Sequence, residues 1–309
     1  MTTEMLRHDS TGLPTEQAPS PLASVADTGR WVAYYRALES ERPDALVHDP
    51  YARRLAGARG EQMYWAMPSP ETASGLLVQR TLVFDELVMR AINRDGVDLV
   101  LNLAAGLDTR PYRLLLPPSL RWLEVDLPDV MAHKQAVLGY EPPICRVERF
   151  SLDLRNRHAR RALFARANAE ARRVLVVTEG LLLYLPPDEV ADLASDLHAE
   201  PRFVSWLADL LSPRAARRMG DLVGTQLAAA RAPIHFAPAD GADFFRPFGW
   251  ELTDYRPALL EAHRLGRDLP VARYWRSMLR VWLSIRKTRR DPLAGTIRLQ
   301  RASRHGSEL

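Results

Sequence analysis

A turn of small residues and an acid placed downstream of it are the residues best suited to bind a nucleoside. The run Ala104-Ala105-Gly106 carries almost no side chain, so the backbone can turn there and a ligand can come close. Asp126 follows twenty residues after Gly106, at the end of a second apolar run. An acid at about that spacing accepts hydrogen bonds from ribose hydroxyls. The pair therefore predicts a nucleoside-binding site.

The turn favours a cofactor without phosphate groups. A dinucleotide site requires the pattern G-x-G-x-x-G, because a pyrophosphate must lie against the backbone and a helix N-terminus. Here only Gly106 remains, and Asp108 adds a negative charge. S-adenosylmethionine (SAM) suits such a turn, since its sulfonium and ammonium groups tolerate nearby carboxylates, while its carboxylate needs a cation. Asp108 is equally well explained as a cofactor contact and as a helix cap.

Alternating strands and helices must position these residues. Short apolar runs predict strands at 97–103, 121–125, 144–150, 173–178 and 202–207, and two later strands at 250–255 and 295–301. Helices are expected at 109–116, 128–138, 156–169, 188–197 and 213–230, and residues 244–249 are expected to form a loop. Repeated βα units with short connections indicate an α/β fold with a doubly wound, mostly parallel sheet.

Three helices are expected before the first strand, at 30–40, in a short segment after Asp49-Pro50, and at 71–93. They would form an N-terminal helical cap over 24–95 in a single domain spanning 24–303. The core of that domain would be 96–303, with a helical insertion at 256–290. Residues 1–23 are polar and rich in proline and serine, which predicts a disordered tail.

The composition argues against several classes of function. The formal net charge of +4 is too small to imply a nucleic-acid partner, and a single cysteine, Cys145, cannot form an intramolecular disulfide. None of the histidines are paired at i,i+4 spacing, so no metal site is expected. The sequence has neither eighteen consecutive apolar residues nor an apolar signal-peptide core at its start. These features predict a cytoplasmic protein without a membrane span.

Several separated motifs resemble one family. The runs LNLAAGLDTRPYRL, WLEVDLPDVMAHK and TEGLLLYL occur in this order. They are similar to the leucine carboxyl methyltransferase family, most closely to its bacterial branch of SAM-dependent O-methyltransferases. SVADTGRWVAYYRALESERPDALVHDPYARRLAG and QRTLVFDEL look like the family's N-terminal segments, and GWELTDYR extends the similarity beyond residue 190. The resemblance implies a Rossmann-like class I methyltransferase sheet of seven strands in the order 3-2-1-4-5-7-6.

The resemblance implies roles for individual residues. Arg80 matches the arginine that holds the carboxylate of SAM, a task that suits a planar, bidentate guanidinium. Gly106 matches the turn beneath the cofactor, and Asp126 matches the acid that binds the ribose hydroxyls. Glu124, on the opposite face of this run from Val125, is less certain. A surface position for Arg80 and a helix N-terminal position for Asp126 are the structural alternatives.

Three more matches complete the implied site. Asp153 and Leu154 match the pair that brackets the adenine, although Asp153 could instead cap the following helix. Glu179, expected at the carboxyl end of a strand, matches an acid beside the methionine portion of SAM. Ala104 departs from the glycine common in the family. Its methyl group lies where the cofactor approaches the backbone most closely, which puts the tightness of binding in question.

Methyl transfer from a sulfonium is an in-line displacement that depends on alignment of the acceptor. A carboxylate acceptor is already ionised, whereas a hydroxyl needs a base. Tyr184 and His235 are the only candidates for that base, and structural roles explain both more easily. The expected function is O-methylation of a small molecule in secondary metabolism. The acceptor expected first is a carboxylate, which gives a methyl ester. The alternative is a methyltransferase fold kept as a binding or non-methylating protein.

Residues 273–290 predict a basic helix. Trp275 and Trp282 share one face, and Arg273, Arg276 and Arg280 lie opposite. The simple interpretation is a docked helix with a solvated arginine side. The alternative is a docking surface for an acidic partner, such as a carrier protein that bears the substrate, or for an anionic membrane. The acceptor itself is expected between the aromatic residues of 31–40 and those of 231–249, although core packing explains these aromatics equally well.

Overall fold

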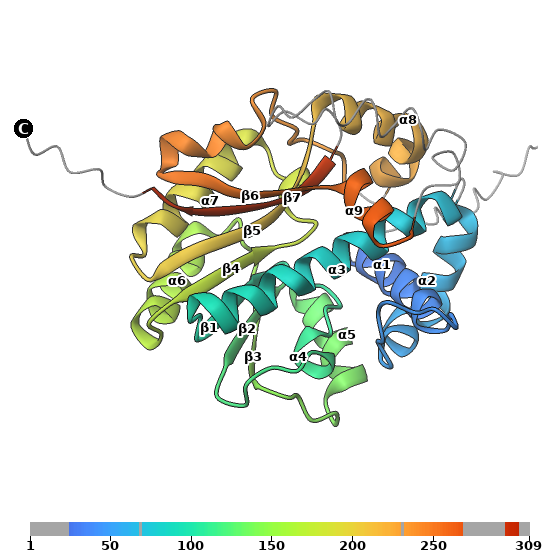
Figure 1. Cartoon of the computed structure of the whole chain (residues 1–309), viewed down its shortest axis with the longest axis horizontal. Coiled ribbons are helices and arrows are strands. Elements are labelled where there is room, and N and C mark those ends of the chain that lie inside the picture. Colours follow the sequence, from blue (N-terminus) through green and yellow to red (C-terminus); the bar gives the residue numbers. More distant parts are fainter. Residues whose placement is uncertain (1–24, 68–69, 230–231, 268–293, 303–309) are drawn as a thin grey trace, which may run out of the picture.

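The protein is described by a computed structural model over residues 25–67, 70–229, 232–267 and 294–302 (Figure 1). One seven-stranded sheet has the order β3-β2-β1-β4-β5-β7-β6, as expected. The first five strands pair in parallel, and β7 runs antiparallel to both β5 and β6. The strands are β1 Leu99–Leu103, β2 Arg121–Asp126, β3 Arg146–Ser151, β4 Val174–Thr178, β5 Phe203–Leu211, β6 Trp250–Pro257 and β7 Ala294–Arg301.

Helices cover both faces of the sheet. The helices are α1 Val25–Ser40, α2 Ala52–Ala66, α3 Pro70–Asp95, α4 Arg110–Arg113, α5 Pro128–Leu138, α6 Arg157–Glu170, α7 Pro187–Ala199, α8 Pro213–Ala229 and α9 Ala258–Arg264. Two 3-10 helices, η1 Leu182–Tyr184 and η2 Gly241–Phe248, complete the described elements. In the described part of the chain, none of the helices is both long and apolar enough to cross a membrane.

The alternation of side chains along β1 explains the two-sided core. Leu101 points to one face and packs in a cluster with Leu163 of α6 and Leu193 of α7. Val100 points to the other face and belongs to a cluster with Phe84 of α3. Figure 1 shows α3 crossing in front of the sheet. Both faces of the central strands are therefore buried, as parallel strands require.

The N-terminal helices cover one end of the sheet. Tyr35 of α1 and Leu55 of α2 are fully buried in a cluster that includes Leu107, just after β1. The two helices approach closely at Gly60, where a Cβ atom would lie 2.6 Å from the carbonyl oxygen of Arg30. Because Leu107 follows the carboxyl end of β1, the cap stands over the strand ends at which ligands bind in open α/β sheets.

Some expected elements differ from the structure. The helix expected at 109–116 is only the single turn of α4; Leu114 is already extended, and a residue before a proline, such as Leu116, disfavours the helical conformation. The loop expected at 244–249 is mostly the 3-10 helix η2, which ends at Phe248 and is followed by Gly249 with φ of 81°. The short helix after Pro50 is longer than expected and has non-helical backbone at Gly57. The expected tail 1–23, the basic helix 273–290 and most of the insertion 256–290 lie outside the described residues.

Candidate cofactor-binding site

The carboxyl ends of the central strands bring distant residues to one edge of the sheet. Leu103 of β1 pairs with Val125 of β2, and Thr178 of β4 pairs with Ala208 of β5. The residues that follow these positions therefore stand next to one another along the edge. They are Ala104, Asp126, Glu179 and Asp209. The sequence predicts the first three of these positions and misses the fourth.

The turn after β1 is held by the acid at the end of β2. Ala104 and Gly106 both have positive φ, 53° and 48°. The amide of Gly106 donates to Asp126 Oδ2 over 2.7 Å, and the amide of Leu127 donates to Oδ1 over 2.7 Å. Burial raises the pKa of Asp126. Since a carboxylate can accept about four hydrogen bonds, Asp126 keeps lone pairs for ribose hydroxyls, and the turn fits a nucleoside.

Arg80 reaches the same edge from α3. Its Nε donates to Glu179 Oε1 over 3.1 Å, and its Nη1 donates to Asp209 Oδ2 over 3.1 Å. The other oxygen of Asp209 accepts from the amide of Gly180 over 2.7 Å. Arg80 is therefore not the surface arginine of the alternative interpretation. A guanidinium beside two carboxylates matches the opposite charges of an amino-acid zwitterion, which is the methionine end of SAM.

Glu179 links Arg80 to a buried arginine that the sequence did not single out. Arg110 Nη2 lies 2.9 Å from Glu179 Oε2, and the Arg110 side chain is only 3% exposed. Burial by itself would raise the pKa of Glu179, but Arg110 and Arg80 lower it below its ordinary value. Glu179 is therefore held ionised between two guanidinium groups. A buried arginine needs such charged partners. In the sequence, the polar run around Arg110 was the only signal that could have pointed to it.

Arg110 also binds the carboxylate of Asp108. Asp108 Oδ1 accepts from the backbone amide of Arg110 over 2.9 Å, and Oδ2 accepts from Asn102 Nδ2 over 2.8 Å and from Arg110 Nη1 over 3.1 Å. Burial opposes ionisation, but Arg110 leads the groups that lower the pKa of Asp108 to about 2. Asp108 therefore accepts a hydrogen bond from the first residue of α4, next to the N-cap residue Thr109, and pairs with the Arg110 side chain.

A third acid that pairs with Arg110, Asp85 of α3, completes the arginine contacts. It lies 2.6 Å from Arg110 Nε, and it accepts from both terminal nitrogens of Arg113 over 2.6 and 2.9 Å. The ion pairs thus form one continuous series that connects β5, the end of β4, α4 and α3. The members of this ion network are Arg80, Arg110, Arg113, Asp85, Asp108, Glu179 and Asp209.

Asp153 and Leu154 follow β3, as predicted. The Asp153 carboxylate accepts from the backbone amide of Arg155 over 3.0 Å and pairs with its guanidinium at 2.6 Å. The side-chain hydrogen bond from Arg155 lowers the pKa of Asp153. Asn156, and not Asp153, caps α6 by accepting from Ala159 N. The capping alternative for Asp153 is therefore wrong, and Leu154 packs against the core beside it.

Three other candidates have distinct positions. Glu124 is fully buried and pairs with Lys134 at 2.8 Å and Arg149 at 2.9 Å, so it holds β2 to α5 and β3. Tyr184 lies near Arg80 and Asp209, and burial raises its pKa to about 12. The side chain of His235 is exposed, while its backbone amide donates to Leu183 O over 2.8 Å. Only Tyr184 of the two base candidates therefore shares the environment of the network.

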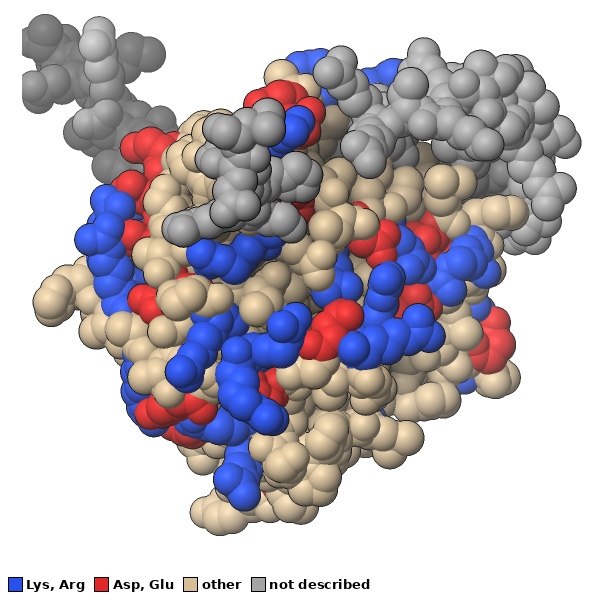
Figure 2. All heavy atoms as spheres, turned by 60° about the vertical axis from the view of Figure 1, so that its left-hand side comes forward, with Lys and Arg blue, Asp and Glu red and all other residues tan. Residues whose placement is uncertain are grey.

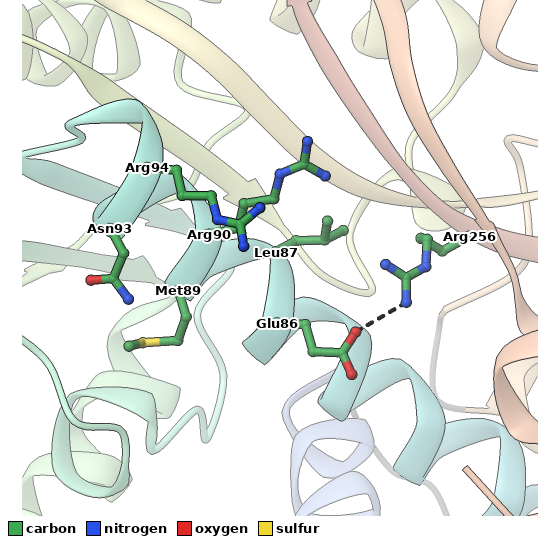
Figure 3. Close-up of a pocket in the computed structure, with 7 residues that line it drawn as sticks. All are labelled: Glu86, Leu87, Met89, Arg90, Asn93, Arg94 and Arg256. Carbon is green, nitrogen blue, oxygen red and sulfur yellow. Dashed lines mark hydrogen bonds and ion pairs between the residues drawn. The ribbon is translucent and has the colours of Figure 1, made fainter. Parts of the chain in front are cut away.

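One hollow of the surface lies away from these residues. It has a volume of 350 Å³ and is lined by the outer side of α3 and by Arg256, which pairs with Glu86 at 3.0 Å (Figure 3). None of its lining residues belongs to the strand edge. On the face shown in Figure 2, basic and acidic side chains are interspersed. This mixture agrees with the small net charge.

Comparisons with known proteins define the class of this chain. A protein of Mycolicibacterium gilvum, named as an S-adenosyl-L-methionine-dependent methyltransferase, is 33% identical over 283 residues, covering 80% of this chain and 89% of the relative. A Streptomyces coelicolor protein with the same type of name is 32% identical over 247 residues, covering 74% and 86%. Together with the fold, these relatives define a SAM-dependent methyltransferase.

The family follows from a second comparison. The model of the leucine carboxyl methyltransferase family matches residues 30–198. The chain therefore belongs to this family, as its motifs indicated. A solved structure of a methyltransferase from Thermobifida fusca shares the fold, with a TM-score of 0.54 and 17% identity, covering 92% of this chain and 96% of that one. SAM is the cofactor, and when bound it supplies a methyl group on a sulfonium.

Proposed function

We propose that the enzyme transfers the methyl group of SAM to the carboxylate of a small apolar molecule, forming a methyl ester. In this proposal the turn at Ala104 and Gly106 lies beneath the cofactor and Asp126 binds the ribose. Arg80 binds the carboxylate of the methionine portion, with Glu179 beside it. Asp153 and Leu154 bracket the adenine.

The observation that carries the carboxylate assignment is the state of Tyr184. Because burial raises its pKa to about 12, the phenol stays protonated at neutral pH. It can therefore donate a hydrogen bond to an acceptor oxygen but cannot remove a proton from one. The acids of the ion network are paired with arginines, and the His235 side chain is exposed. A hydroxyl acceptor would need a base that these residues do not offer, whereas a carboxylate needs none.

An apolar cluster beside Tyr184 supports an apolar acceptor. Met63 of α2 and Met67, which follows α2, are buried there with Ala232. Trp31, Tyr184 and Met219 pack against them. Methionine side chains adapt to ligands of varied shape. Among the described residues, no acceptor meets full hydrogen-bond geometry with the buried indole N–H of Trp31, although the Tyr35 hydroxyl lies beside it. The nearby Tyr35 hydroxyl instead donates to Pro70 O over 2.9 Å. A carboxylate oxygen would give this indole donor a better aligned acceptor than the Tyr35 hydroxyl offers.

The test is methyl transfer from radiolabelled SAM to a panel of carboxylic acids of graded hydrophobicity, each paired with the alcohol of the same skeleton. We expect label in a base-labile product from the apolar acids and none from the alcohols. A base-stable product would contradict ester formation. Tyr184→Phe should lower transfer to the acids, while Tyr140→Phe, at a fully exposed position, should leave it unchanged.

The same assay addresses the alternative function. If SAM binds and no acceptor from a metabolite extract is labelled, the chain is a binding or non-methylating protein of this fold. A role in secondary metabolism and a cytoplasmic location remain predictions. An acidic carrier protein as partner also remains a prediction, because the basic segment 273–290 lies outside the described residues.

A further inference from the structure

The ion network carries an unequal number of charges. It contains three guanidinium groups and four carboxylates, which leaves one negative charge when all are ionised. Among the residues that the structure describes, neighbouring charged groups do not change this balance. The Arg36–Asp49 pair, which Thr109 connects to Arg113, is neutral in itself. Lys134 and Arg149 add two positive charges, and Glu124 and Asp126 add two negative charges. A buried excess charge is costly unless a ligand or solvent compensates it.

The excess is accessible at one end of the network. Arg110 and Arg113 are 3% and 5% exposed, whereas Arg80, Glu179 and Asp209 are 18%, 15% and 15% exposed. Within the described part of the chain, Asp209 pairs with one guanidinium, that of Arg80; its other oxygen accepts from the backbone amide of Gly180. Glu179, in contrast, pairs with two. Asp209 is therefore the carboxylate with the least compensated charge at the open end.

The two forms of the cofactor differ by one charge at this end. SAM carries a sulfonium, an ammonium and a carboxylate, and thus one net positive charge. S-adenosylhomocysteine (SAH), the product, lacks the sulfonium charge and is neutral. With SAM, the network and the ligand together are neutral; with SAH, one negative charge remains. An uncompensated charge in a partly desolvated site weakens binding.

We propose that Asp209 is a specificity-determining residue, whose charge favours SAM over SAH and so promotes release of the product. The proposal rests on the cofactor placement given under the proposed function. In this proposal Asp209 distinguishes the two ligands by their charge and not by their shape. Burial raises the pKa of Asp209, so a positive ligand beside it also favours its ionised form.

The test is calorimetric titration of the full chain with SAM and with SAH, comparing wild type and Asp209→Asn. We expect the ratio of the SAH Kd to the SAM Kd to fall about tenfold in the variant, equivalent to about 1.4 kcal/mol. A unit charge several ångströms away has an effect of this order at the effective dielectric constant of a protein site. An unchanged ratio would overturn the proposal.

Further variants separate the possible failures. Asp209→Ser is a second neutral variant that keeps an oxygen for the Gly180 amide, in case the asparagine does not fold. Asp192→Asn removes a surface charge paired with Arg157 and should leave the ratio unchanged. Leu154→Ala removes the proposed adenine contact, so it should weaken both ligands equally. If Leu154→Ala weakens neither ligand, the placement of the cofactor fails; if only the ratio in the Asp209 variants stays constant, the role of Asp209 fails.

Discussion

Asp108 should stabilise the folded protein far more than it contributes to cofactor affinity. The substitution Asp108→Asn keeps the size of the side chain and removes its charge. In the structure the carboxylate accepts three hydrogen bonds, two of them from Arg110 and one from Asn102. The substitution leaves Arg110 with Asp85 and Glu179 as its remaining charged partners.

The pKa of Asp108 sets the magnitude. A fall from 3.8 to about 2 corresponds to roughly 2 kcal/mol of stabilisation at neutral pH, since one pKa unit is about 1.4 kcal/mol. Because the folded-state pKa is the lower one, this stabilisation is complete above pH 3.8 and is lost as the pH falls towards 2. The wild type should therefore exceed Asp108→Asn by about 2 kcal/mol at neutral pH and by roughly half of that near pH 3.

Urea unfolding followed by tryptophan fluorescence at a series of pH values measures this difference. Asp240→Asn, at an exposed position, serves as the control and should change the unfolding free energy by less than about 0.5 kcal/mol. Equal stability of Asp108→Asn and wild type at neutral pH would refute the reasoning. So would a large loss of SAM affinity without loss of stability, because Asp108 would then be a cofactor contact.

Three further substitutions test local features of the structure. Ala104→Gly relieves a φ of 53° and should raise the unfolding free energy by up to about 1 kcal/mol and tighten SAM binding; a less stable variant would contradict this expectation. Gly60→Ala would place a Cβ atom 2.6 Å from Arg30 O and should cost about 1–3 kcal/mol in urea unfolding, whereas wild-type stability would mean that α1 and α2 can separate freely. Lys134→Met leaves Glu124 with Arg149 as its charged partner and should lower the unfolding free energy by about 3 kcal/mol. Adding Glu124→Leu should recover most of this loss, and no recovery would argue against a charge effect.

The sequence was sufficient to predict the order of the elements and the strand edge. Apolar runs of strand length located β1, β2 and β4, because central parallel strands are buried on both faces. The resemblance then supplied the seven-strand order, which the structure confirms. It also selected Asp126, Glu179 and Arg80, which the fold brings to one edge.

The ion network could not be predicted from the sequence, because it depends on packing between distant elements. Arg110 lies in a polar run that also suits an exposed helix, and only the fold places it between α3 and β4. Asp209 stands within a strand whose apolar residues dominate the pattern, although an acid in such a run is itself unusual. The predicted length of α4 was wrong for a related reason. The contacts of its arginines and the prolines that follow it outweigh the helical spacing of the residues in the sequence.

In the proposed site, the edge formed by Ala104, Gly106 and Asp126 binds SAM. Calorimetric titration of the wild type and of Asp126→Ala with SAM tests it most directly, with circular dichroism and urea unfolding to confirm that the variant is folded. We predict that the wild type binds SAM and that a folded Asp126→Ala binds at least about tenfold more weakly, because hydrogen bonds to a charged group contribute roughly 1.5–3 kcal/mol. Equal affinities of the two proteins would contradict the placement of the cofactor at this edge.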